Sequence, residues 1–149
     1  MKFQSKLILV GFLLSLAINV QAAGDLTNQE LKVVNVKLGN QSGDHKFYPD
    51  IIEFETGRMY ALRLENPSPH EYYFSSNGLA DSVFTRKVLV FGDDGKVISE
   101  VYGPVRRLEL KPGAVVEWWF YPLRVGQFDD VVSTKKHTEA GMKAKIIIR

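Results

Sequence analysis

Short apolar segments separated by turn residues run from residue 31 to the end of the sequence, and they restrict the fold more than any other feature. Alternating apolar and polar positions rich in Val, Ile and aromatic residues are typical of strands. Gly92-Asp93-Asp94-Gly95 is a strong hairpin signal between two such segments. No long stretch of helical periodicity occurs in this part of the sequence. We expect strands at 31–38, 51–55, 59–64, 70–74, 84–91, 97–102, 107–110, 115–121, 128–132 and 144–148.

These regularly spaced strands predict an all-β protein, an antiparallel or mixed β-sandwich. A chain of 149 residues, 45% of them hydrophobic, has the size and composition of a single domain with its own core. The sequence contains no cysteine, so packing without disulfides must hold the fold together.

The first residues have the pattern of a secretory signal peptide. Lys2 and Lys6 form a basic start, residues 7–20 are apolar, and Val20-Gln21-Ala22 offers a cleavage site. We expect a signal peptide at 1–22 and a mature domain at 23–149, located in the periplasm or secreted. The apolar run is short for a membrane span, so we expect no span in the mature chain. An uncleaved anchor is the alternative.

The charge balance argues against nucleic acid as a partner. The chain has 19 basic and 17 acidic residues, and removal of Lys2 and Lys6 leaves 17 of each. A mature chain without net charge lacks the basic bias of nucleic-acid-binding proteins. Sequence motifs for nucleophilic, phosphate-binding or zinc-protease chemistry are also missing, so we expect a protein that is not an enzyme.

An ordered set of fragments in the mature chain resembles the small blue-copper proteins, the cupredoxins. The fragments are Phe47-Tyr48-Pro49, Asn66 followed by His70, Leu110-Lys111-Pro112-Gly113 followed by Glu117-Trp118, and finally Gly126, Phe128, His137, Gly141 and Met142. The resemblance covers nearly all of the mature chain. It implies a single cupredoxin-like Greek-key β-sandwich after the signal peptide.

The resemblance also implies a copper site from which one ligand has been lost. By position, His70, His137 and Met142 match copper ligands, while Val132 stands where the family has its cysteine. Since no other cysteine is available, bound copper would lack the thiolate that makes such sites blue. Imidazole suits copper and zinc, and a thioether favours Cu(I). We therefore expect a non-blue copper site.

Two further residues leave alternatives open. Asp130 stands where the family usually has an apolar residue. In a regular strand it shares a face with Phe128 and Val132 and could supplement the metal site, whereas a bulge would turn it to solvent, which we favour. His45 lies in a polar turn and could be an extra ligand, but we expect a solvated loop residue.

Several functions are compatible with this reading. The leading one is an exported copper-binding protein that stores, delivers or tolerates copper without blue-copper electron transfer. The alternative is a metal-free structural or interaction protein with an envelope protein as its partner. A third is an accessory of a non-blue copper redox enzyme.

Overall fold

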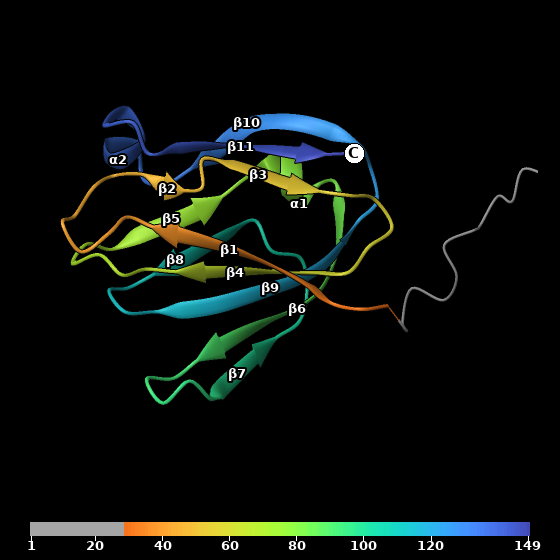
Figure 1. Cartoon of the computed structure of the whole chain (residues 1–149), viewed down its shortest axis with the longest axis horizontal. Helices are drawn as coiled ribbons and strands as arrows, with labels where there is room; N and C mark the ends of the chain where they lie inside the picture. Colours follow the sequence, from red (N-terminus) through yellow and green to blue (C-terminus); the bar gives the residue numbers. More distant parts are fainter. Residues whose placement is uncertain (1–28) are drawn as a thin grey trace, which may run out of the picture.

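The computed structural model describes residues 29–149, which form a two-sheet β-sandwich with two short helices (Figure 1). The signal peptide expected at 1–22 lies outside the described residues. Among those residues, no helix is long and apolar enough to cross a membrane. The elements are β1 (Lys32–Leu38), β2 (Phe47–Tyr48), β3 (Ile51–Phe54), β4 (Tyr60–Glu65), β5 (Tyr72–Ser75), α1 (Asn77–Ala80), β6 (Val83–Phe91), β7 (Val97–Val101), β8 (Arg107–Leu110), β9 (Val115–Pro122), β10 (Gly126–Val132), α2 (Lys135–Glu139) and β11 (Lys143–Ile148).

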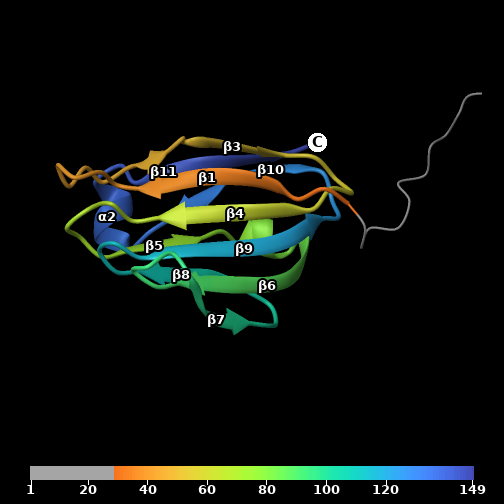
Figure 2. The ribbon, with the colours of Figure 1, turned by 60° about the horizontal axis from the view of Figure 1, so that its bottom comes forward.

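The two sheets face each other across one core (Figure 2). The strand order is β2-β1-β4-β9-β6-β7 in the first sheet and β3-β11-β10-β5-β8 in the second. β1 pairs with β4 and β3 with β11 in parallel, and the other pairs are antiparallel. The sandwich is therefore mixed, and the prediction of an all-β fold is confirmed.

The core follows from the alternation that the sequence shows. β11 alternates exposed or half-buried residues with fully or nearly fully buried ones, as does most of β9. Trp118 and Phe120 point inward from β9, with ring centroids 5.3 Å apart, and the Trp118 indole N–H donates to Thr85 Oγ1 at 3.0 Å. Each fully buried large apolar side chain contributes roughly 1.5–3 kcal/mol.

β10 departs from regular geometry close to the region that carries the predicted ligands. Its register against β11 shifts between Phe128 and Val131, which is a bulge. Val131 is fully buried as a result, while Val132 is half-buried. Beyond the end of β10 the chain forms α2, a short helical turn.

Candidate metal centre

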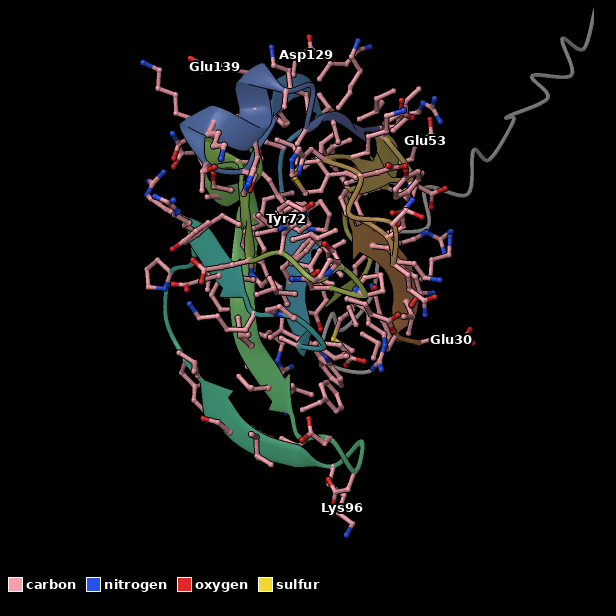
Figure 3. The ribbon with its side chains drawn as sticks, turned by 90° about the vertical axis from the view of Figure 1, so that its left-hand side faces the viewer. Glu30, Glu53, Tyr72, Lys96, Asp129 and Glu139 are labelled. Carbon is pink, nitrogen blue, oxygen red and sulfur yellow. The ribbon has the colours of Figure 1, made fainter. Side chains whose placement is uncertain are left out.

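Three loops at one end of the sandwich carry the histidines of the chain. The loops are 39–46 before β2, 66–71 before β5 and 133–142 between β10 and β11, and all lie at the left in Figure 1. This end is the far one from residue 29. Figure 3 looks onto it, with Tyr72 near the centre of the view and α2 above. We call His45, His70, His137 and Tyr72 the histidine pole.

The His70 loop is fixed by buried polar side chains. Asn66 Nδ2 donates to the carbonyl oxygens of His70 at 2.7 Å and Leu110 at 2.8 Å. Ser68 Oγ accepts from the His70 N–H at 3.0 Å. Asn66 and Ser68 are 1% and 2% exposed, so these bonds replace water for the loop backbone. The His70 side chain itself is exposed.

His137 lies in α2 with one nitrogen that lacks a partner. The main-chain N–H of His137 donates to the Thr134 side chain, which caps the helix, at 3.2 Å. Within residues 29–149, His137 Nδ1 is a buried side-chain nitrogen with no hydrogen-bond partner. Burial lowers the pKa of His137, and the nearby His45, Lys136 and His70 lower it further, while Glu71 opposes them. The neutral imidazole, the form that binds metals, is therefore favoured.

Met142 is tied to His137 through the main chain. Its N–H donates to the His137 carbonyl oxygen at 3.0 Å, and its side chain is fully buried in the core cluster. Gly141 directly before it has a φ of +104°, a conformation that favours glycine. The thioether is thus held at the inner side of the same loop that presents His137.

His45 is not the solvated loop residue that we expected. It is half-buried, and its ring is stacked on that of His137 with centroids 4.6 Å apart. Its centroid lies 5.4 Å from that of His70. His45 therefore contacts both predicted ligands. Sequence reasoning undervalued it because nothing local shows that residues 45, 70 and 137 meet.

Two glycines allow the loop that carries His45 to approach so closely. A Cβ atom on Gly43 would lie 2.9 Å from His70 Nε2, and one on Gly39 would lie 2.6 Å from Tyr72 Cε2. Both glycines have positive φ angles, +82° and +74° respectively. These two positions are a sequence signal that could have indicated close packing around the histidines.

The position matched to the missing cysteine does not supply a replacement ligand. Val132 pairs with Lys143 of β11 and Ser75 of β5. The bulge that we favoured at Asp130 is present, but the carboxylate accepts hydrogen bonds from Ser76 Oγ at 2.6 Å and from the Gly78 N–H at 2.7 Å. Its carboxylate thus holds the start of α1 instead of facing solvent or a metal.

The side chains at and beside the pole are of types that bind copper, but their donor atoms do not surround one point in this structure. As the described side chains are placed, no three from His, Cys, Asp and Glu could hold a metal ion. The unpartnered Nδ1 of His137, next to two more imidazoles, nevertheless presents the nitrogen chemistry that copper accepts. His70, His137 and Met142 are the residues that would hold it, without a thiolate.

No protein-family model matches the sequence, and no curated protein matches it either. Solved structures do match. Reduced auracyanin from Roseiflexus castenholzii has a TM-score of 0.51 at 11% identity, over 79% of this chain and 97% of that one. Auracyanin A, a "blue" copper protein from Chloroflexus aurantiacus, has a TM-score of 0.50 at 13% identity, over 80% and 100%.

A larger protein contains a similar unit. The chain matches the multicopper oxidase of Campylobacter jejuni with a TM-score of 0.53 at 12% identity, covering 80% of this chain and 30% of the oxidase. Identities this low establish the fold alone. With two packed sheets, this topology and these matches, the described chain has the cupredoxin fold.

Proposed function

We propose that this protein binds copper at the histidine pole, in a site without thiolate. His70 and His137 supply nitrogen, and Met142 supplies sulfur. The single observation that carries the proposal is the buried, unpartnered Nδ1 of His137 among other imidazoles. A buried polar atom without a partner costs about 1–3 kcal/mol, and a metal bond to this nitrogen would remove that cost.

The chemistry of the donors favours holding copper over transferring electrons. A thioether prefers Cu(I), whereas Cu(II) takes further oxygen or nitrogen donors in a tetragonal shell. Because Cu(I) and Cu(II) favour different coordination shells, the ligands of such a site must rearrange each time an electron is transferred. Storage, delivery or tolerance of copper in the periplasm or outside the cell is therefore the role that we assign, with no catalytic step.

The test is copper binding by the purified protein and a double variant. Wild type is titrated with Cu(I) without oxygen and with Cu(II), each against a chromophoric chelator, and metal content is measured independently. We expect one copper per chain for wild type and loss of that copper in His70→Ala/His137→Ala. Lys135→Ala/Lys136→Ala, which alters two exposed neighbours on α2, is the matched control. Equal binding by the double histidine variant would refute the ligand assignment.

One observation favours the second candidate, a metal-free interaction protein of the cell envelope. Every residue of β7 is exposed, including Ile98 at 68%, and Tyr102 just after it is 69% exposed. Beside β7 lies a groove of about 410 Å³ lined mainly by apolar side chains such as Val90, Val105 and Leu108. We call β7, β8 and this groove the β7–β8 edge. Exposed apolar surface of this kind is typical of interaction sites.

A further inference from the structure

The end of the sandwich opposite the histidine pole exposes apolar side chains beside a cation. Leu123 and Val125 are 62% and 63% exposed, and they flank the exposed Arg124 in the connection between β9 and β10. We propose that this connection, which we call the 123–125 loop, contacts the surface of a lipid bilayer that contains anionic lipids. The contact is with the membrane surface and is not a span. It goes beyond copper binding and does not depend on it.

Hydrogen bonds to the body of the domain keep the 123–125 loop in place. The Leu123 N–H donates to the Ser82 carbonyl oxygen at 2.8 Å, and the Gly57 N–H donates to the Pro122 carbonyl oxygen at 3.0 Å. Arg124 Nη2 donates to Ser82 Oγ at 3.3 Å. The loop therefore presents its apolar side chains in a fixed geometry, and a contact made through them loses little main-chain freedom.

A third apolar side chain lies at the same end. β6 begins beside the last residues of β9, where Phe84 pairs with Tyr121 and the preceding Val83 pairs with Pro122. Phe84 is exposed, as Leu123 and Val125 are. The strength of interfacial binding increases with the apolar area that enters the boundary between headgroups and acyl chains, so these three side chains can act together.

The charges at this end favour an anionic surface. Arg58 is paired with Glu55, and Arg149 with Glu53. Arg124 instead donates to a hydroxyl, so no acidic side chain in this contact offsets its charge. An arginine between two apolar side chains can keep its guanidinium at the level of the lipid phosphates while its neighbours enter the apolar region. This arrangement is complementary to an anionic bilayer.

The chain also enters the domain at this end, which is why we choose a bilayer over a protein partner. In the first sheet Lys32 lies beside Tyr60, and Tyr60 beside Phe120 near the end of β9. Figure 1 shows the chain entering β1 and leaving β9 at the right, away from the histidine pole. Residues 21–28 link this end to the apolar run 7–20 and span at most roughly 30 Å. A chain that still carries this run in a membrane holds this end near the bilayer.

The experiment measures binding of the mature chain, residues 23–149, to lipid vesicles. Both sheets and the core cluster lie within residues 29–149, so this chain keeps the folded domain without the apolar run. Metal-free protein is sedimented with vesicles of mixed phosphatidylglycerol and phosphatidylcholine, and with vesicles of phosphatidylcholine alone. The variants are Leu123→Ser/Val125→Ser and Arg124→Gln. Ile98→Ser, which alters a similarly exposed apolar residue in β7, is the matched control.

We expect wild type and Ile98→Ser to bind the phosphatidylglycerol vesicles and to bind less as salt rises. Leu123→Ser/Val125→Ser should bind at least about tenfold more weakly, and Arg124→Gln about fivefold more weakly. A wild type that does not bind these vesicles, or a double variant that binds as wild type does, would overturn the inference. Loss of binding in Ile98→Ser alone would overturn it too, since the contact would then lie at the β7–β8 edge.

A fluorescent label locates the contact directly. Because the chain has no cysteine, Leu123→Cys and Ile98→Cys can each carry an environment-sensitive fluorophore at a single position. We expect the emission of the label at position 123 to shift to the blue when phosphatidylglycerol vesicles are added, and the emission of the label at position 98 to stay unchanged. The reverse result would contradict the assignment of the 123–125 loop. Because the protein is free of metal, neither result bears on copper binding.

Discussion

The histidine pole holds a polar atom away from water, whereas the β7–β8 edge holds apolar side chains in water. At the pole a polar atom, His137 Nδ1, is buried without a partner. At the edge, apolar side chains such as Ile98 and Tyr102 stand in solvent. A buried nitrogen is satisfied by a proton donor or a metal, whereas exposed apolar surface is satisfied by another macromolecule. The two regions therefore favour different functions, and variants in each can separate them.

The largest expected effect is a gain at the pole. Val132→Cys restores the thiolate position, and we expect its Cu(II) form to show an intense visible thiolate-to-copper band that wild type lacks. The band requires residue 132, His70 and His137 to surround one ion. The visible spectrum of the loaded variant, with Val131→Cys as a matched neighbour in the core, measures this. A colourless Cu(II)-loaded Val132→Cys protein would show that the loops do not converge.

Met142→Leu tests the proposed sulfur ligand of the copper site. Leucine fills nearly the same core volume, so stability should fall by less than about 1.5 kcal/mol. Cu(I) affinity should drop at least about tenfold, or about 1.4 kcal/mol, and Cu(II) affinity should drop less. Parallel competition titrations of the two oxidation states check this. Equal losses, or none, would remove Met142 from the ligand set.

Asp130→Asn tests whether Asp130 belongs to the metal site. The carboxylate accepts from Ser76 Oγ and the Gly78 N–H, so its loss should lower the free energy of unfolding by about 1 kcal/mol. Chemical denaturation measures this change. Copper affinity should remain at the wild-type value, and a marked decrease would return Asp130 to the metal site.

Ile98→Ser addresses the β7–β8 edge and should have the smallest effect on the isolated protein. Ile98 is 68% exposed, so stability should change by no more than about 0.5 kcal/mol. Copper binding should be unaffected, as chelator competition can show. Weakened copper binding would mean that the two regions are coupled, against the separation drawn above.

The sheets could be predicted better than the site because each strand produces a local pattern in the sequence. Alternation along β9 and β11 and the Gly92–Gly95 turn are visible in the sequence, and the structure confirms the strands and hairpin that they predict. The bulge that we favoured at Asp130 is also present, as the register shift between Phe128 and Val131 shows. The sequence pattern could not show that the Asp130 carboxylate would then bond to Ser76 and Gly78, two residues far from it in the sequence, instead of facing solvent.

The site depended on contacts between distant residues, which local patterns cannot show. His45 has an ordinary turn context, yet Tyr72, 27 positions away, holds its ring between two other imidazoles. Gly39 and Gly43 permit that approach. The need for glycine at these two positions becomes clear once the atoms that a Cβ would meet there are known. His70 and His137 could be named in advance because of the resemblance, not because of their own surroundings.

A crystal structure of the copper-loaded protein, with anomalous differences measured at the copper absorption edge, tests the central claim most directly. The account predicts one strong peak at the histidine pole, within bonding distance of nitrogen atoms of His70 and His137. A peak elsewhere, or a loaded crystal with no ordered copper at the pole, would contradict it.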